Sequence, residues 1–237
     1  MASAWLILPT YNEASNLELM VRAVLPQLAQ DGASSTILVV DDASPDGTGA
    51  IADRLSAEIP EVRVLHRERK DGLGRAYLAG FAVALEGGAD LVLQMDCDFS
   101  HDPADVPRLM AAASAADVVL GSRYVAGGGV ENWALRRRIQ SRGGCAYARL
   151  ILGVPVRDLT GGFKCWRRTA LEALDLGGVD AHGYGFQIEM TYRAIQARLS
   201  VTEVPIVFRE RREGQSKMTA RITLEAVWKV PALRLRG

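Results

Sequence analysis

Paired cysteines, long apolar runs and a signal-peptide pattern are all missing from this 237-residue sequence. Its three cysteines, Cys97, Cys145 and Cys165, are odd in number and widely scattered, which suits neither a disulfide framework nor a zinc site. We therefore expect a reducing compartment. No apolar run approaches the roughly 18 residues that a spanning helix needs, and the first residues lack the basic and apolar segments of a signal peptide. The expectation is a cytoplasmic protein that meets a membrane only peripherally or through a partner.

The sequence also has no formal net charge, because 28 Lys and Arg residues balance 28 Asp and Glu residues. Without an overall positive field, a nucleic-acid partner is not expected. Any bound anion must then be held by local clusters of basic side chains. The 49% apolar content is enough for a substantial core, and the length fits one large domain or one domain with a small appendage.

The first half of the chain alternates short apolar runs with segments of helical spacing. Strands are expected at residues 5–9, 36–41, 62–66, 90–95 and 117–121. Helices are expected at residues 14–30, 48–57, 73–86 and 104–113. The strand runs around Val39 and Val92 are apolar at successive positions, as is usual for parallel strands covered on both faces. The pattern predicts an α/β fold with an open, mostly parallel sheet flanked by helices.

After about residue 125 this alternation stops. A glycine-rich loop at residues 127–129 precedes a basic helix expected at residues 136–152, and a further strand is expected at residues 201–208. No linker separates the two halves, so we expect one domain over residues 1–218. Residues 219–237 have an imperfect amphipathic pattern, which suits either contact with a membrane or partner, or packing back onto the domain.

The carboxyl ends of the expected strands are unusually acidic, and open α/β sheets bind their ligands at these ends. Asp96 and Asp98 bracket one residue at the end of the fourth strand. Two such carboxylates suit Mg²⁺ or Mn²⁺ that bridges two phosphates. Acidic pairs are also common in simple turns, so it is the position of this pair after a buried strand that favours a metal site.

Two further strand ends are open to two interpretations. Asp41 and Asp42 end the second strand and precede a tight turn. Turn chemistry explains the residues after them but not two adjacent carboxylates, one of which could accept hydrogen bonds from a nucleotide base or ribose. Asn12 and Glu13 follow the first strand and could either cap a helix or contact a ligand. His101, a lone histidine beside a turn, is expected to cap or pack rather than to bind metal.

Basic side chains gather at the end of the fifth strand, at the start of the basic helix and near the C-terminus. These residues are Arg123, Arg136, Arg137, Arg138, Arg211, Arg212 and Lys217. The arginine fork binds phosphate oxygens in pairs, and Ser141 lies one turn beyond Arg137 on the same helix face. Each arginine alone is equally well explained by a solvated surface. The three clusters together favour a site for an anion.

Several motifs follow one another along the chain: LPTYNE (8–13), VVDD (39–42), SPDGT (44–48), GLG (72–74), MDCDFSH (95–101), GSRY (121–124), DLTG (158–161), GFQIE (185–189), EVPI (203–206), and Arg211 with GQSK (214–217). Taken together, they resemble the polyprenol (dolichol) phosphate mannosyltransferases. These enzymes belong to the large inverting glycosyltransferase family with the GT-A fold. The resemblance covers nearly the whole chain and implies that fold, with C-terminal helices on the acceptor side.

The resemblance also implies roles for residues on the donor side. The residues that would face the guanosine are Pro9, Tyr11, Glu13, Asp42 and Asp96. Asp98 would hold the metal ion on the diphosphate, with Asp96 as the second carboxylate of the metal site. Some relatives carry glutamine where this chain has Ser100, so a contact from Ser100 to the metal is expected only through water.

On the acceptor side, the resemblance implies that Arg123, Arg137 and Ser141 grip a lipid phosphate. Arg211 and Lys217 match a loop that closes over the donor phosphates. The implied reaction is transfer of mannose from GDP-mannose to a polyprenyl phosphate in a membrane, with inversion, at the cytoplasmic face. An integral membrane protein could recruit the chain there. Because the acceptor phosphate is already largely dianionic near pH 7, with a second pKa of about 6, no strong general base and no covalent intermediate are expected.

Three other functions fit parts of the sequence. One is a related transferase that uses another nucleotide sugar, such as UDP-glucose. A sugar nucleotidyltransferase would instead carry a glycine- and arginine-rich loop after the first strand, where this chain has TYNE (10–13). A catalytically silent scaffold that keeps the fold is the third, and the intact Asp96, Asp98, Arg123 and Arg211 count against it.

Overall fold

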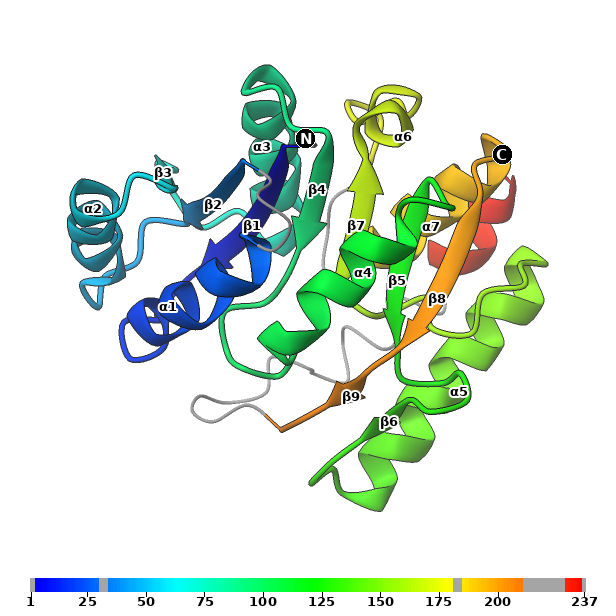
Figure 1. The fold of residues 1–237 in the computed structure, drawn as a ribbon. Coiled ribbons are helices and arrows are strands. Elements are labelled where there is room, and N and C mark those ends of the chain that lie inside the picture. The colour runs from blue at the N-terminus through cyan, green and yellow to red at the C-terminus, as the bar shows by residue number, and fades with distance from the viewer. Residues whose placement is uncertain (1–2, 30–33, 181–184, 211–228, 236–237) are drawn as a thin grey trace.

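The computed structural model describes residues 3–29, 34–180, 185–210 and 229–235, and its centre is a seven-stranded sheet (Figure 1). From edge to edge the strands are β3 (Val62–His66), β2 (Ser35–Asp41), β1 (Ala4–Thr10), β4 (Leu91–Gln94), β7 (Lys164–Arg167), β5 (Val118–Ser122) and β8 (Val201–Pro205). β7 runs antiparallel to both of its neighbours, and the other pairs in this sheet are parallel. The prediction of a mostly parallel α/β sheet is confirmed.

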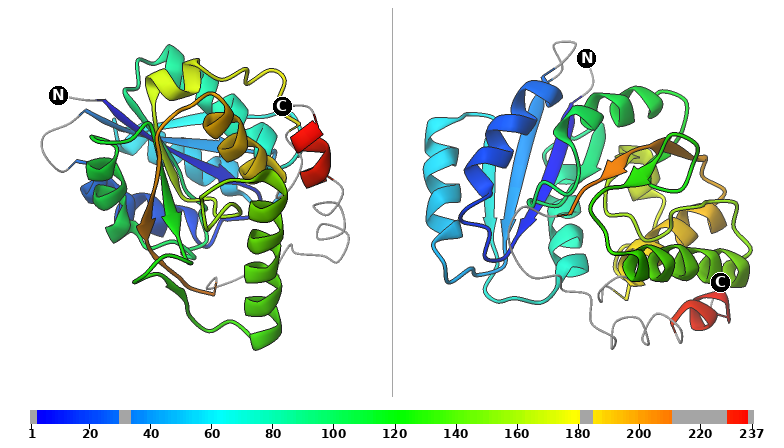
Figure 2. Two further views of the ribbon diagram at one scale, coloured as in Figure 1. Left: turned by 90° about the vertical axis from the view of Figure 1, so that its right-hand side faces the viewer. Right: turned by 90° about the horizontal axis from the view of Figure 1, so that it is seen from below.

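Helices cover both faces of the sheet (Figure 2). One face packs against α1 (Leu17–Leu28), α2 (Thr48–Glu58) and α4 (Val106–Ala112), which follows the 3-10 turn Pro103–Asp105. The other face packs against α3 (Leu73–Glu86), α5 (Leu135–Leu152), α6 (Arg168–Glu172) and α7 (Gly185–Gln196). The side chains of β1 explain the two layers: Trp5 and Ile7 join one buried cluster and Leu6 joins the other, because successive strand side chains point to opposite faces.

Two strands differ from the sequence prediction. β7 was not predicted, because its four residues KCWR begin and end with basic side chains that hide a buried strand. The single strand expected at residues 201–208 is two strands: β8 stays in the main sheet, and β9 (Val207–Phe208) leaves it to pair with β6 (Gly129–Val130). The glycine-rich loop thus supplies the partner of β9 and joins the second half of the chain to the sheet edge.

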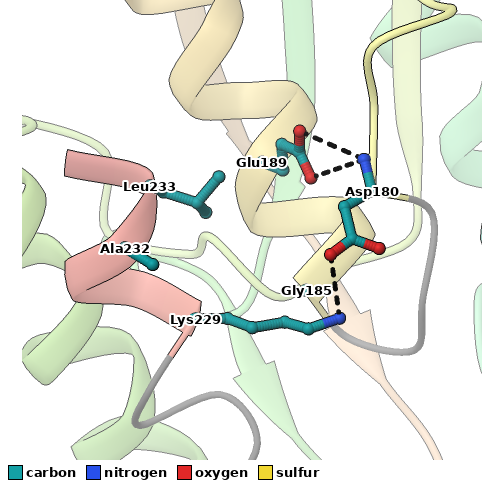
Figure 3. A pocket seen from close by; sticks show the side chains of 6 residues that line it. All are labelled: Asp180, Gly185, Glu189, Lys229, Ala232 and Leu233. Atoms are coloured by element: carbon teal, nitrogen blue, oxygen red, sulfur yellow. Dashed lines mark hydrogen bonds and ion pairs between the residues drawn. The ribbon is translucent and has the colours of Figure 1, made fainter. Parts of the chain in front are cut away.

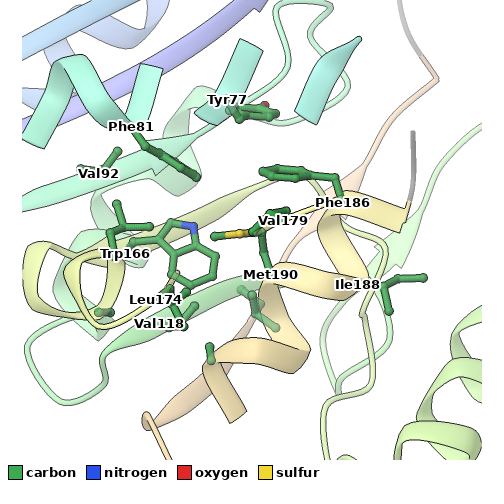
Figure 4. Close-up of a cluster of buried hydrophobic side chains, with 14 of the residues drawn as sticks. Tyr77, Phe81, Val92, Val118, Trp166, Leu174, Val179, Phe186, Ile188 and Met190 are labelled. Carbon is green, nitrogen blue, oxygen red and sulfur yellow. The ribbon is translucent and has the colours of Figure 1, made fainter. Parts of the chain in front are cut away.

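Aromatic side chains fix the start of α7 against α3 (Figure 4). Tyr77 of α3 stacks with Phe186 of α7, with ring centroids 5.9 Å apart and planes inclined by 4°. Phe81 meets the edge of Trp166 of β7 at 6.4 Å, and the indole N–H of Trp166 donates to Oε1 of Gln94 at 2.7 Å. These contacts position α7 beside the carboxyl end of β4.

Residues 229–235 form a helix that packs back onto the domain. Val230 is buried in the cluster that includes residues of α5 and α7, and Arg234 donates to the backbone carbonyl of Ile151 at 2.7 Å. Residues 219–237 were expected either to contact a membrane or partner or to pack back onto the domain. Residues 229–235 pack back onto the domain. Residues 219–228 and 236–237, and with them the expected boundary after residue 218, lie outside the described residues.

Candidate active site

β1 and β4 lie side by side at the centre of the sheet, and the strand order reverses between them. From β1 the chain builds outward through β2 and β3, whereas β4 begins the other half of the sheet. Such a reversal opens a ligand crevice at the carboxyl ends of the strands. Because β1, β2 and β4 are parallel, the predicted residues at their ends share this edge, as does Pro9, the penultimate residue of β1.

The carboxylate of Asp41 stabilises the turn that follows β2. It accepts hydrogen bonds from the hydroxyl of Thr10 at 3.1 Å, from the backbone N–H of Ser44 at 3.1 Å and from the hydroxyl of Ser44 at 2.5 Å. The two adjacent carboxylates are therefore not equivalent. Asp41 is explained by the turn, and Asp42 is the one that turn chemistry leaves unexplained.

Asp42 faces the loop after β3. Its carboxylate accepts from Nη1 of Arg67 at 2.5 Å and from the backbone N–H of Asp71 at 3.4 Å. Lys70 of the same loop places its ammonium 3.7 Å from the ring centre of Tyr11. Arg67 and Lys70 are not among the residues predicted from the sequence, although both lie in the loop that follows β3 and so at the same edge of the sheet.

Glu13 takes one of the two roles considered for it, at the start of a helix, and its contact with a ligand stays a prediction. Its backbone carbonyl and its carboxylate both accept hydrogen bonds from Asn16, at 3.0 and 2.9 Å, which fixes the start of α1. The backbone N–H groups of Asn12 and Glu13 donate to the hydroxyls of Ser44 (3.1 Å) and Thr48 (3.0 Å). The loop after β1 is thereby tied to the loop after β2, on one side of the crevice.

Asp96 and Asp98 lie in a tight turn after β4. The hydroxyl of Tyr77 donates to Asp96 at 3.3 Å, and the backbone N–H of Ser100 donates to Asp98, which is 4% exposed, at 3.0 Å. Phe99 has a φ of +59°, a left-handed conformation that is uncommon for a bulky residue. Strain of this kind concentrates at functional sites. The hydroxyl of Ser100 is buried and makes no hydrogen bond to the described residues.

This turn offers a metal ion hard oxygen ligands, but few of them. Within the described ranges, no three His, Cys, Asp or Glu side chains are grouped so that they could hold a metal ion. The residues present fit a divalent cation that takes most of its ligands from a bound diphosphate, with Asp98 and the orphaned hydroxyl of Ser100 beside it. Cys97 is a poor metal ligand here, because burial raises the pKa of its thiol well above the usual range.

His101 is buried between aromatic rings, 5.2 Å from that of Phe163 and 5.1 Å from that of Phe208. Burial lowers the pKa of His101 to about 4, against the opposing effect of Asp98, so its ring is neutral near pH 7. The expectation that His101 packs is confirmed. The guanidinium carbon of Arg123 lies 5.4 Å from the centre of the same Phe208 ring, so the histidine that follows the acidic turn shares an aromatic neighbour with the first predicted arginine.

Arg123, which follows β5, is held in a buried ion pair. Nε donates to Oδ2 of Asp158 at 2.7 Å, and Nη2 donates to Oδ1 of Asp158 at 2.6 Å and to the hydroxyl of Thr160 at 2.8 Å. Burial alone would lower the pKa of Arg123, but Asp158 outweighs burial and raises it. A phosphate would have to share this guanidinium with Asp158. Asp158 belongs to the DLTG motif (158–161), whose spacing alone predicts no role for it.

Arg137 and Ser141 lie on α5, beside Arg123. The guanidinium carbon of Arg137 is 4.0 Å from the ring centre of Trp133, and that of Arg123 is 5.7 Å from the same ring. The hydroxyl of Tyr124 donates to Ser141 at 2.6 Å. Nε of Arg137 and Nε1 of Trp133 are buried donors without a partner among the described residues. The structure thus brings the three predicted acceptor-side residues together and adds Trp133, which no spacing in the sequence marks.

Arg211 and Lys217 lie outside the described residues. Their predicted closure over the donor phosphates stays a prediction.

A small hollow lies at the start of α7, lined by Asp180, Gly185, Glu189, Lys229, Ala232 and Leu233 (Figure 3). Lys229 pairs with Asp180 across it at 3.4 Å. Its volume of ≈ 60 Å³ is room for about two water molecules. Pockets for small molecules begin near about 300 Å³. Since the hollow is small and none of the predicted site residues lines it, we assign it no ligand.

A family model described as glycosyl transferase family 2 matches residues 5–175 of the chain. The chain belongs to glycosyl transferase family 2. It is therefore a glycosyltransferase. The matched residues of this family 2 enzyme run from β1 to just beyond α6 and include the acidic turn, Arg123, Arg137 and Ser141.

Curated relatives carry more specific names. The family 2 enzyme is 48% identical to the undecaprenyl-phosphate mannosyltransferase of Micrococcus luteus over 93% of this chain and 89% of that protein. It is 49% identical to the polyprenol monophosphomannose synthase of Mycolicibacterium smegmatis over 98% of this chain and 86% of that protein. The resemblance found in the sequence is confirmed.

Solved structures show the same fold at lower identity. Glucosyl-3-phosphoglycerate synthase from Mycobacterium tuberculosis, in complex with Mn²⁺, UDP-glucose and phosphoglyceric acid, aligns with a TM-score of 0.72 and 20% identity. The alignment covers 98% of this chain and 80% of that one. The GT-A fold is thereby confirmed for this family 2 enzyme. In the part of the chain that the structure describes, no helix has both the length and the apolar character that a membrane crossing requires.

Proposed function

We propose that this family 2 glycosyltransferase moves mannose from GDP-mannose to a polyprenyl phosphate, with inversion at the anomeric carbon. The observation that supports this most strongly is the 48% and 49% identity to two proteins whose names pair mannose with a polyprenyl carrier. The site suits a reaction between two anions. Asp98 lies between a donor side, where carboxylates face the nucleotide, and an acceptor side, where arginines face the phosphate.

The donor side is the edge formed by the carboxyl ends of β1, β2, β3 and β4. We assign the guanosine of the donor to Pro9, Tyr11, Glu13, Asp42 and Asp96. Arg67 orients the Asp42 carboxylate through its hydrogen bond at 2.5 Å, so that the second carboxylate oxygen can accept a hydrogen bond from a ribose or base. Lys70 holds the ring of Tyr11 by a cation–π contact.

Asp98, with Asp96 beside it, would hold Mg²⁺ or Mn²⁺ at the donor diphosphate. When bound, the metal would stabilise the negative charge that develops on the departing GDP. Ser100 turns its backbone N–H toward Asp98, which fixes that carboxylate in place. Arg211 and Lys217, which the resemblance assigns to the donor phosphates, would add positive charge there.

The acceptor side is built from Arg123, Arg137 and Ser141. Arg137 pairs with the carboxylate of Glu210. That carboxylate stands in for a phosphate, since both are oxyanions that accept from the arginine fork. We propose that the acceptor phosphate displaces Glu210 from Arg137 and also accepts from the indole N–H of Trp133, which has no partner among the described residues.

The chemistry needs alignment more than acid or base catalysis. An oxygen of the acceptor phosphate dianion forms a bond to the anomeric carbon as the bond from that carbon to the diphosphate breaks and its electron pair leaves with GDP. No proton has to be removed from the attacking oxygen. The arginines oppose the repulsion between the two phosphate groups and hold them in line. Buried His101, neutral near pH 7, is not needed as a base.

We further propose that α5 lies against the membrane that carries the acceptor. Leu135, Ile139 and Leu150 are 70%, 64% and 80% exposed. At 3.6 residues per turn they fall on one side of the helix, opposite the buried Cys145 and Leu152. α5 contains five arginines and no acidic residue. An exposed apolar stripe flanked by arginines suits a surface of anionic lipid.

The proposal is tested by offering the purified protein GDP-mannose and UDP-glucose separately, each with a polyprenyl phosphate in detergent and with Mg²⁺ or Mn²⁺. Formation of a mannosyl lipid from GDP-mannose alone, stopped by a chelator, is the expected result. Transfer of glucose with no transfer of mannose would replace the proposed donor, and no transfer from either donor would contradict the proposal.

A further inference from the structure

Gln187, in the first turn of α7, carries a buried amide that makes no hydrogen bond within the part of the chain that the structure describes. The residue is 2% exposed, and both Nε2 and Oε1 lack a partner among the described residues. An unsatisfied amide in the protein interior destabilises the fold, and most buried polar groups are paired. The GFQIE motif (185–189) around Gln187 has no role that its spacing predicts, and none of the proposed catalytic steps involves Gln187.

The amide lies next to the acidic turn. A Cβ atom added to Gly162 would be 3.6 Å from both carboxylate oxygens of Asp96 and 3.6 Å from Nε2 of Gln187. The carboxylate and the amide therefore flank the same glycine, whose missing side chain leaves space between them. This is the end of β4, where the donor is proposed to bind.

The backbone of Gln187 is held from two directions. Nζ of Lys164 donates to the Gln187 carbonyl at 2.8 Å and to the hydroxyl of Thr191 at 2.9 Å. The preceding Phe186 stacks on Tyr77, whose hydroxyl donates to Asp96, and Figure 4 shows the two rings facing each other. The unpaired amide thus stands on a rigid support, as groups that position a substrate do.

The hydrogen-bonding groups of the Gln187 amide indicate which part of the sugar donor this side chain binds. The amide of Gln187 offers N–H donors and a carbonyl acceptor, whereas a phosphate only accepts and would leave the carbonyl without a hydrogen bond. A sugar hydroxyl both donates and accepts. We propose that Gln187 binds a hydroxyl group of the hexose that is transferred and so helps to select the donor sugar. This inference rests on the proposed function only in taking a nucleotide-linked hexose as the donor.

The test replaces Gln187 by methionine, which has a similar size and no amide. Gln187→Met is expected to raise the Tm by about 2–4 °C, because it removes an unsatisfied polar group. It should leave the affinity for GDP unchanged and lower kcat/KM for GDP-mannose about tenfold. Gln187→Leu repeats the test with a different apolar shape. Gln196→Met, an exposed position on the same helix, is the matched control and should change neither quantity.

Deoxy analogues of GDP-mannose, each lacking one hydroxyl, identify the contact. The analogue that lacks the bound hydroxyl should be about tenfold poorer for the unmodified enzyme and no poorer than GDP-mannose for Gln187→Met, a non-additive pair. A fall in Tm with an equal loss of GDP affinity, or additive losses for every analogue, would overturn the inference. If the unmodified enzyme transfers a different hexose, the proposed function fails, and the same comparison with that donor and its deoxy analogues decides the role of Gln187.

Discussion

Arg123 and Asp158 form a two-point ion pair in the interior, with Nε 2.7 Å from Oδ2 and Nη2 2.6 Å from Oδ1. The side chains are 7% and 0% exposed. The pair joins the end of β5 to the loop before β7, so it fixes the acceptor side of the site to the sheet. It also means that the arginine implied to grip a phosphate already has a carboxylate partner.

Replacing Asp158 should therefore cost stability as well as activity. Asp158→Asn leaves the Arg123 cation buried without its counter-charge, and we expect the free energy of unfolding to fall by about 3–5 kcal/mol. Urea unfolding measures this. Glu172→Gln, which breaks the exposed pair between Glu172 and Arg168, is the matched control and should change stability by less than about 1 kcal/mol. Equal effects of the two substitutions would show that the buried pair is not structural.

Lys164 predicts a pH dependence of stability. Burial lowers the pKa of Lys164 to about 7, with Asp158 acting against that shift. The ordinary value is about 10.4, so between pH 7 and pH 10 the unfolded chain binds more protons than the folded one, and stability rises with pH. Below pH 7 both states are protonated, and the contribution no longer changes.

Urea unfolding of the unmodified protein and of Lys164→Met at several pH values from 7 to 10 isolates this effect. The difference in stability between the two should grow by a few kcal/mol in favour of the unmodified protein as the pH rises. Parallel curves would mean that Lys164 is not the titrating group.

The exposed stripe on α5 predicts membrane binding. Leu135→Ser combined with Ile139→Ser should weaken binding to vesicles of anionic lipid about tenfold or more, because two large apolar side chains no longer enter the interface. Leu19→Ser, which removes a 55% exposed leucine from α1, is the control and should have no effect. Vesicle sedimentation measures both. Unchanged vesicle binding of the double variant would show that α5 does not bind the membrane.

The sheet and the acidic turn could be predicted because their signals are local. Apolar runs and helical spacing mark β1 to β5, and the position of Asp98 after a buried strand marks the crevice. Asp41 and Asp42 look alike in the sequence, and only the hydrogen bonds to Thr10 and Ser44 separate the turn-forming carboxylate from the other.

The residues that were missed depend on contacts between distant segments. Arg67 meets Asp42 across 25 positions, and Asp158 meets Arg123 across 35. No periodicity predicts such partners, since they are chosen by the packing of loops at one sheet edge. Gln187 is harder still to predict, because what marks it is a missing hydrogen bond, which only the folded chain reveals.

The central claim is a division of labour between Asp98, on the donor side, and Arg137, on the acceptor side. The most direct measurement is mannosyl transfer from GDP-mannose to a short, water-soluble polyprenyl phosphate with Mg²⁺, together with the Kd for GDP-mannose. Both are measured in Asp98→Ala and in Arg137→Ala. Arg138→Ala, which changes an exposed neighbour, is the control. Asp98→Ala should lower kcat about a hundredfold or more. Arg137→Ala should raise the KM for the lipid about tenfold or more while the Kd for GDP-mannose stays within about twofold, and Arg138→Ala should resemble the unmodified enzyme. Equal losses of GDP-mannose binding in Asp98→Ala and Arg137→Ala, or normal use of the lipid by Arg137→Ala, would contradict the account.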